Sequence, residues 1–171
     1  MSDLSFTHLD PSGRARMVDV TSKEATHRRA VARGKVFMLP ATTAAIANRE
    51  VGKGDVLAVA RVAAIQAAKR TSEMIPLCHQ VLVGAVNVNF EIGDDCIDIE
   101  VTVDTVDRTG VEMEALHACG IAALTIYDMC KSADRGMVIG EVALWEKTGG
   151  RSGTYRRTAN VASVVTKVVE S

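Results

Sequence analysis

Residues 81–106 read VLVGAVNVNFEIGDDCIDIEVTVDTV, and they carry the clearest secondary-structure pattern in the chain. Apolar and polar residues alternate along both of its halves, a period of two that is typical of strands with one buried face. Gly93, Asp94 and Asp95 separate the halves, as in the turn of a hairpin. The stretch therefore predicts two antiparallel strands with one buried face and one solvent-exposed face. The inward positions are predicted to be Leu82, Gly84, Val86, Val88, Phe90, Ile92, Ile97, Ile99, Val101 and Val103.

Strand and helix patterns continue on both sides of this hairpin. Residues 28–39, RRAVARGKVFML, alternate weakly and stop at Pro40, which predicts a strand ended by a residue without a backbone donor. Residues 111–132 contain no breaker but Gly120 and have helical spacing, whereas residues 135–147 alternate again. These patterns predict a helix followed by another strand.

Two helices are expected between the first strand and the hairpin. Thr42 or Thr43 is suited to cap a short helix that runs through Glu50. Asp55 is suited to cap a longer helix that ends near Ser72, and its many alanines permit close helix approach.

The resulting order is strand, helices, strand, strand, helix, strand. This order predicts an α+β fold of the ferredoxin-like, split βαβ type, with an antiparallel sheet covered by helices on one face. Residues 17–157 are expected to form a single domain, with a flexible N-terminal arm at 1–16 and a tail at 158–171 that is either amphipathic or disordered.

Composition excludes several classes of protein. The chain has 171 residues and a net charge of -1, and only 4% of its residues are aromatic, which argues against nucleic-acid binding. Its four cysteines include no CxxC pair, so a zinc site is not expected. Neither a leader peptide nor an apolar run of membrane-spanning length is found, and we expect a cytoplasmic protein with reduced thiols and no membrane partner.

Glycines and cations recur at segment ends. Residues 52–55, Gly-Lys-Gly-Asp, place Lys53 at a helix start, where backbone amides favour a phosphate, although a solvated turn explains the same residues. Residues 147–153, KTGGRSG, combine two cations with three glycines, and a flexible basic tail is the alternative. Lys69, Arg70 and Lys131 lie at further segment ends. Together these cations suggest a polyphosphate ligand.

The helix at 111–132 carries an unusual polar stripe. Glu114, Thr125, Asp128 and Lys131 project within about 60° of one direction at 100° per residue. The stripe is either a solvated surface or a functional site, and its apolar neighbours favour pairing or function.

Two further features have a functional and a simpler interpretation. Glu112 and Glu114 would lie side by side only if the chain is still extended there, and they would then grip the N–H edge of a guanine or pterin ring. Favourable acidic residues in a first helical turn are the alternative. His79 lies in the Pro-containing loop 75–79 and either contacts phosphate, shuttles a proton or is simply solvated.

Eight strings in the chain resemble the MoaC family of molybdenum cofactor biosynthesis over about residues 15–157. They are MVDV at 17–20, KGDV at 53–56, RVAAIQAAKRT at 61–71, IPLCH at 75–79, TGVEMEAL at 109–116, AALTIYDMCK at 122–131, DRGMVIG at 134–140 and KTGGRSG at 147–153. The resemblance implies a lyase that converts 3′,8-cyclo-7,8-dihydroguanosine 5′-triphosphate to cyclic pyranopterin monophosphate and diphosphate. It also implies a homohexamer, a trimer of dimers with active sites at the dimer interface. No cofactor is implied, and Mg²⁺ accompanying the substrate triphosphate is left open.

The resemblance also assigns residues by matching motifs. Asp128, Lys53 and Lys131 resemble the catalytic residues of the family. The residues that resemble its substrate-binding positions are Leu77, Cys78, His79, Met113, Glu114, Glu112, Lys69, Lys147 and Arg28. Arg28 is expected to supply a cation to the site from the neighbouring subunit, although Arg29 is adjacent.

The chemistry of the implied reaction explains why such a site needs both acid–base groups and cations. Rearranging a purine to a pterin moves protons, and forming a cyclic phosphate displaces diphosphate, so acid–base groups and cations are both required. We expect Lys53 and Lys131 to depress each other's pKa so that one lysine acts as a base. Two alternatives are a non-catalytic nucleotide or phosphate-binding module of the same fold and a purely structural oligomer.

Overall fold

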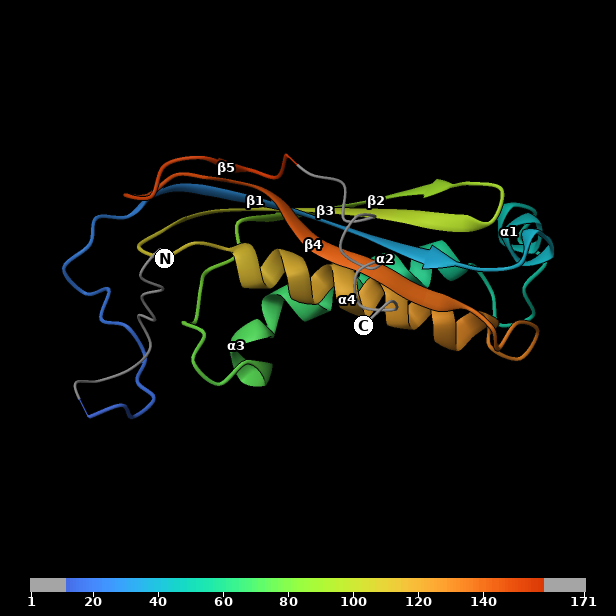
Figure 1. Cartoon of the computed structure of the whole chain (residues 1–171), viewed down its shortest axis with the longest axis horizontal. Coiled ribbons are helices and arrows are strands. Elements are labelled where there is room, and N and C mark those ends of the chain that lie inside the picture. Colours follow the sequence, from blue (N-terminus) through green and yellow to red (C-terminus); the bar gives the residue numbers. More distant parts are fainter. Residues whose placement is uncertain (1–11, 159–171) are drawn as a thin grey trace, which may run out of the picture.

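The computed structural model describes residues 12–158, so most of the expected arm and nearly all of the expected tail lie outside the described part. Residues 12–25 form no helix or extended strand. The elements in chain order are β1 (Thr26–Phe37), α1 (Pro40–Ala47), α2 (Val56–Lys69), α3 (Thr71–Met74), β2 (Ala85–Ile92), β3 (Cys96–Asp107), α4 (Glu112–Cys130), β4 (Val138–Thr148) and β5 (Tyr155–Arg156) (Figure 1).

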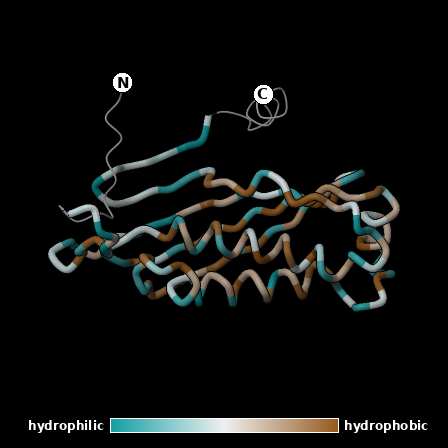
Figure 2. The backbone as a smooth tube through the Cα atoms, turned by 60° about the horizontal axis from the view of Figure 1, so that its bottom comes forward, coloured by the Kyte–Doolittle hydropathy of each residue, from teal (hydrophilic) through white to brown (hydrophobic). Residues whose placement is uncertain are grey.

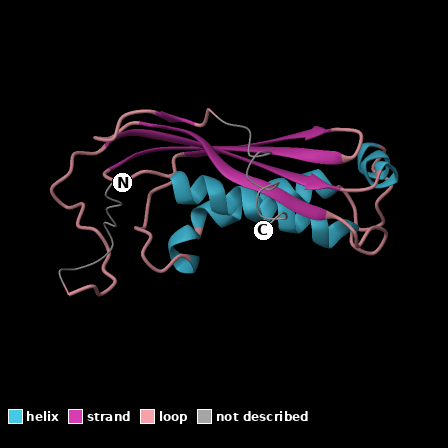
Figure 3. Ribbon diagram, viewed as in Figure 1, coloured by secondary structure: helices cyan, strands magenta, loops and turns pink. Residues whose placement is uncertain are grey.

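The sheet confirms the predicted ferredoxin-like arrangement. Its strand order is β2-β3-β1-β4-β5, and every neighbouring pair is antiparallel. The long helices α2 and α4 lie against one face of this sheet (Figure 3). The short β5 extends one edge beyond the four strands that the sequence predicts. In the described part of the chain, no helix has both the length and the apolar character needed to cross a membrane.

The core lies between the sheet and the two long helices. Ile97, Ile99, Val101 and Val103 of β3 are all buried, as the alternation predicts. Alanines on α2 and α4 are buried as well, which lets these helices pack closely. Hydrophobic colouring accordingly runs through the strands and the long helices (Figure 2). Fourteen residues of α2 and nineteen of α4 thus form a continuous second layer.

The solvent face of the sheet carries ion pairs between directly opposed residues. Arg29 contacts Asp104 at 2.8 Å, Arg33 contacts Glu100 at 2.7 Å and Lys35 contacts Asp98 at 3.1 Å. Each pair is in register between β1 and β3. Opposite charges at such positions favour one register over its neighbours. This face is therefore polar, as the sequence predicts.

Sequence predictions at several element ends are wrong. Leu82 is 84% exposed, because β2 begins only at Ala85 and Leu82 precedes the sheet. The first helix is not capped by Thr42 or Thr43. It begins at Pro40, whose fixed φ and missing N–H suit the first helical position.

The two threonines have other partners. The Thr42 hydroxyl donates to Asp134 at 3.1 Å, and the Thr43 hydroxyl lies 2.8 Å from the carbonyl oxygens of Pro40 and Asp94. Helix α1 also ends at Ala47, before the predicted end at Glu50. The prediction for Asp55 is confirmed, since its carboxylate accepts from the Ala58 amide at 2.9 Å.

Gly34 of β1 leaves no room for a side chain. A Cβ there would lie 2.8 Å from Cys119 Sγ of α4 and 3.3 Å from a methyl group of Val142. We expect Gly34→Ala to destabilise the fold by about 1–3 kcal/mol through overpacking. Thermal unfolding checks this, with Cys119→Ala and the double variant as controls. If the double variant recovers none of the loss in melting temperature, contact with the sulfur is not the cause.

Candidate functional site

The predicted catalytic residues meet at the C-terminal end of α4. The Lys53 ammonium donates to the Asp128 backbone carbonyl at 2.7 Å and lies 3.5 Å from Asp128 Oδ2. The Lys131 ammonium lies 2.6 Å from Asp128 Oδ1. Lys53 reaches this position from the turn before α2. Gly54 in this turn has a φ of +102°, and Asp55 caps the helix that follows. One carboxylate is therefore held between two cations.

The charges of this group fix its protonation. A hydrogen bond from Lys131, together with the charges of Lys131 and Lys53, lowers the pKa of Asp128. The hydrogen bond to Asp128 raises the pKa of Lys131. The expectation that the lysines depress each other's pKa is therefore wrong for Lys131, because the carboxylate between them outweighs the repulsion. Lys131 is an ammonium group and Asp128 a carboxylate at neutral pH.

A second group lies at the N-terminal end of α4. Cys78 Sγ lies 3.7 Å from Glu114 Oε1, and Glu114 is only 2% exposed. Glu114 Oε2 is buried with no hydrogen-bond partner in residues 12–158. Burial raises the pKa of the Glu114 carboxyl. Burial, followed by the Glu114 charge, raises the pKa of the Cys78 thiol to about 11, so the thiol stays protonated and donates to the carboxylate.

The unpartnered Glu114 oxygen should cost stability. Because burial raises its pKa in the folded chain, the free energy of unfolding falls as pH rises from the unfolded pKa through the higher folded one. We expect Glu114→Gln to unfold about 2–4 °C higher than wild type at pH 8 and at the same temperature at pH 4. Glu91→Gln, at an exposed position of β2, is the control. A gain that is equal at both pH values would contradict this origin.

His79 contacts the segment at 17–20, and the sequence gives no sign of this contact. His79 Nε2 lies 2.6 Å from the Val18 carbonyl oxygen. A carbonyl only accepts, so Nε2 carries the proton and Nδ1 keeps its lone pair when the ring is neutral. The prediction of a loop histidine is confirmed in position, and its environment is specific, because the half-buried ring is tied to the segment before β1.

Arg28, Lys147 and Glu112 line a cavity of about 710 Å³ at the same end of the molecule. Arg28 donates to the backbone carbonyls of Asp107 at 3.3 Å and Arg108 at 3.2 Å. Arg29 instead pairs with Asp104 on the sheet face. Both arginines line the cavity, but the charge of Arg29 is already paired, so Arg28 remains the candidate.

Glu112 and Glu114 do not form the side-by-side pair that an extended chain would give. Both belong to the first turn of α4, where two residues correspond to about 200° of rotation. Glu112 lines the cavity, whereas Glu114 is buried against Cys78. The remaining candidates surround this end of α4: Met113 is 38% exposed beside Glu114, Leu77 precedes Cys78, and Lys69 is exposed at the end of α2.

The candidate residues therefore fall into two separate groups. Glu114 and Asp128 are fourteen positions apart on one helix, which corresponds to about 21 Å at 1.5 Å per residue. Lys53 and Lys69 are likewise at the two ends of α2, which runs antiparallel to α4 (Figure 1). Of the stripe predicted from the sequence, Asp128 and Lys131 are in contact, but Glu114 lies too far along the helix to meet them within one chain.

Comparison with known proteins identifies the family. A family model described as "MoaC family" matches residues 17–150, most of the chain. The chain belongs to the MoaC family. The relatives of this MoaC chain include a "Cyclic pyranopterin monophosphate synthase" from Thermomicrobium roseum, 58% identical over 154 residues that cover 89% of this chain and 93% of the relative.

Two further relatives have consistent names. A "Cyclic pyranopterin monophosphate synthase" from Roseiflexus is 57% identical and covers 91% of this MoaC chain and 98% of the relative. A "Molybdenum cofactor biosynthesis bifunctional protein" from Chlorobaculum tepidum is 54% identical over 91% of this chain, which corresponds to 51% of that longer protein. All twelve candidate residues lie between Arg28 and Lys147, inside the region that the family model matches.

Proposed function

We propose that this MoaC chain is a cyclic pyranopterin monophosphate synthase, a phosphorus–oxygen lyase that converts 3′,8-cyclo-7,8-dihydroguanosine 5′-triphosphate to cyclic pyranopterin monophosphate and diphosphate. The observation that carries the proposal is the placement of Asp128 between Lys53 and Lys131 in a chain whose relatives bear that name. A carboxylate flanked by two cations supplies the acid–base groups that the ring rearrangement requires.

The pKa directions assign roles within this group. Lys131 is protonated at neutral pH and acts as a proton donor or as a cation facing phosphate oxygens. Asp128 orients both lysines as a carboxylate, and it accepts a proton only once the contacts that lower its pKa are broken. A lysine of this group can serve as the base only after it loses its proton. This requires that substrate binding first draws the Asp128 carboxylate away from the lysine, because their contact favours the protonated lysine.

The group at the other end of α4 binds the substrate in this proposal. Glu114 is buried, and its free Oε2 is suited to accept from a ring N–H, which would satisfy the unpartnered oxygen. Leu77 and Met113 offer apolar contact, and Cys78 and His79 offer donors or acceptors. The candidate cations at this end are Arg28, Lys69 and Lys147, which are suited to phosphate oxygens.

A complete site then requires more than one copy of the chain. Catalysis needs groups within about 3 Å of the reacting atoms, but the two groups lie about 21 Å apart within one chain. A second copy placing its Asp128 group against this copy's Glu114 group removes the conflict. We therefore propose that each active site lies at a dimer interface. The homohexamer, a trimer of dimers, is what the family resemblance implies, and we propose it on that ground, with no nucleic-acid or membrane partner.

The proposal includes no protein-bound cofactor. Within residues 12–158, no cluster of three His, Cys, Asp or Glu side chains is arranged to hold a metal ion. Whether Mg²⁺ accompanies the substrate triphosphate is left open. All four cysteines are free thiols, which suits a cytoplasmic location.

The experiment is turnover by the purified full chain. The protein is incubated with enzymatically prepared 3′,8-cyclo-7,8-dihydroguanosine 5′-triphosphate, and diphosphate and the pterin product are measured together, with Asp128→Ala as the control. Product from the wild type and none from the control supports the synthase. Binding of the nucleotide without release of diphosphate would indicate a non-catalytic nucleotide-binding module instead.

A further inference from the structure

The cavity at the N-terminal end of α4 contains more cations than the candidate set explains. It is lined by six of them, Lys23, Arg28, Arg29, Arg108, Lys147 and Arg151, against two carboxylates, Glu24 and Glu112. The chain as a whole has a net charge of -1, so this positive charge is local. Its volume of about 710 Å³ lies in the range of small-molecule sites. Clustered like charges repel each other, and an anionic ligand relieves that repulsion.

The partners of these cations show which charges are already compensated. Arg29 is paired with the Asp104 carboxylate. Arg28 donates to two neutral backbone carbonyls, and Lys147 contacts the neutral Ser152 hydroxyl, so neither charge is balanced by these contacts. Within residues 12–158, no hydrogen bond or ion pair engages the side chains of Arg108 and Arg151. Both exposed guanidinium groups are free to close on a ligand.

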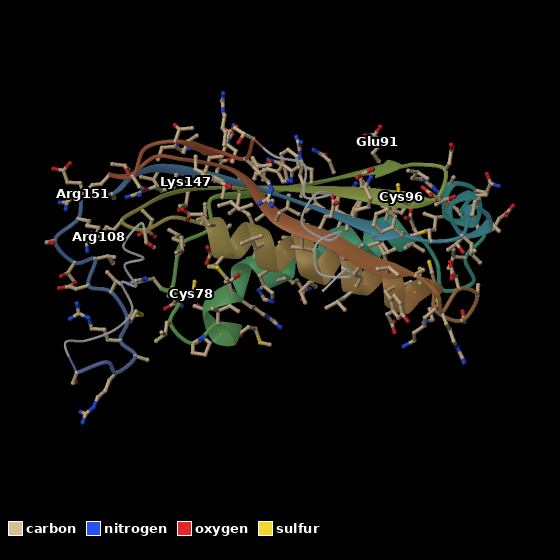
Figure 4. The ribbon with its side chains drawn as sticks, viewed as in Figure 1. Cys78, Glu91, Cys96, Arg108, Lys147 and Arg151 are labelled. Atoms are coloured by element: carbon tan, nitrogen blue, oxygen red, sulfur yellow. The ribbon has the colours of Figure 1, made fainter. Side chains whose placement is uncertain are left out.

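Arg28 contacts both loops that carry the free arginines, the β3–α4 loop with Arg108 and the loop after β4 with Arg151. The Arg28 guanidinium donates to the carbonyl of Arg108, which fixes the β3–α4 loop. The loop after β4 also approaches Arg28 closely, because a Cβ at Gly150 would overlap the present position of the Arg28 guanidinium. Gly150 also has a φ of +74°, which other residues rarely adopt. Arg151 follows directly in this loop, and Figure 4 places Arg108, Lys147 and Arg151 toward the same end of the molecule.

From this arrangement we infer that Arg108 and Arg151 bind a linear diphosphate group and hold the leaving diphosphate of the substrate triphosphate. The assignment to substrate rests on the proposed function. Guanidinium groups bind phosphate oxygens through paired, charge-assisted hydrogen bonds. Displacement of diphosphate transfers negative charge to the leaving group, and two arginines beside Arg28 and Lys147 stabilise that charge. Arg108 lies outside the set of residues that the family resemblance assigns, and Arg151 lies just beyond the matched region.

The first test is binding of inorganic diphosphate, which requires no turnover. Isothermal titration calorimetry without Mg²⁺ compares the full-length wild type with Arg108→Ala, Arg151→Ala and the double variant. We expect each single change to weaken binding about 10-fold, because one charge-assisted hydrogen bond contributes at least that much. Arg156→Ala is the matched control, since it removes an exposed arginine that lies outside the cavity and pairs with Glu146. If Arg108→Ala and Arg151→Ala bind diphosphate as tightly as Arg156→Ala does, the inference is wrong.

Steady-state kinetics then separate this inference from the proposed function. The two variants should raise KM about 10-fold, because the terminal phosphates are already charged in the bound substrate. They should also lower kcat, because the arginines stabilise the additional charge that develops on the leaving diphosphate. A wild type that binds diphosphate through both arginines but releases no product would overturn the synthase and leave the anion site. Normal turnover together with unchanged diphosphate binding in both variants would overturn the anion site and leave the synthase.

Discussion

A one-to-one mixture of Asp128→Ala and Glu114→Gln subunits is expected to recover about a quarter of wild-type activity, although each variant alone is impaired. Loss of Asp128 removes an acid–base group and should lower kcat about 100- to 10,000-fold. Glu114→Gln replaces one acceptor oxygen with a donor and should lower kcat/KM about 10- to 100-fold. Recovery is expected because the two residues lie about 21 Å apart on α4 and cannot serve one substrate within one chain.

The expected fraction follows from a two-fold symmetric pair. In a mixed pair, one of the two sites combines the intact Asp128 of one copy with the intact Glu114 of the other, and the second site carries both changes. Random association makes about half of the pairs mixed, and one of the two sites in each is intact. The subunits are co-expressed with different tags, the mixed oligomers are purified, and release of diphosphate is measured.

The matched control uses two changes from the same group. Asp128→Ala and Lys131→Ala both change the group at the C-terminal end of α4. Each of the two sites in their mixed pairs therefore lacks either Asp128 or Lys131. This mixture should show no recovery. Equal recovery in both mixtures, or none in either, would contradict a site shared between two copies.

The fold could be predicted from the sequence because its strands have one buried face, which gives an alternating apolar pattern. Ile97 to Val103 alternate with polar residues, and the structure buries the apolar ones as predicted. The errors lie at element ends, where local capping signals compete with tertiary partners. Thr42 has the chemistry of a helix cap, yet a buried contact to Asp134, 92 residues away in the sequence, engages its hydroxyl. No local pattern contains that partner.

The site was predictable in its parts but not in its arrangement. The motif match selects Asp128 and its two lysines, and these are in contact. The helical wheel also places Glu114 and Asp128 in one direction, but it omits the rise along the axis that separates them. The sequence also gives no sign that Val18 holds His79, or that Arg28 connects the two loops of the cationic cavity, because these contacts join distant segments.

Asp128→Asn should both abolish most of the turnover and lower the pKa of Lys131. In the wild type, the hydrogen bond and charge of Asp128 raise the pKa of Lys131 above its ordinary value. The amide keeps the shape of the side chain but removes the negative charge, and the Lys53 ammonium is then no longer compensated. Lys131 should therefore lose its proton at a lower pH, while kcat falls about 100- to 10,000-fold.

The measurement is a carbon-detected NMR titration of the lysine Cε signals from pH 7 to 11.5, with Lys131 assigned through Lys131→Arg, in parallel with turnover. Asp98→Asn is the matched control, because Asp98 raises the pKa of Lys35 through the same kind of contact on the far face of the sheet. It should lower the pKa of Lys35 and leave turnover unchanged. If Asp128→Asn leaves the titration of Lys131 where it was, the carboxylate does not control this lysine. If turnover survives as well, Asp128 is not part of the chemistry.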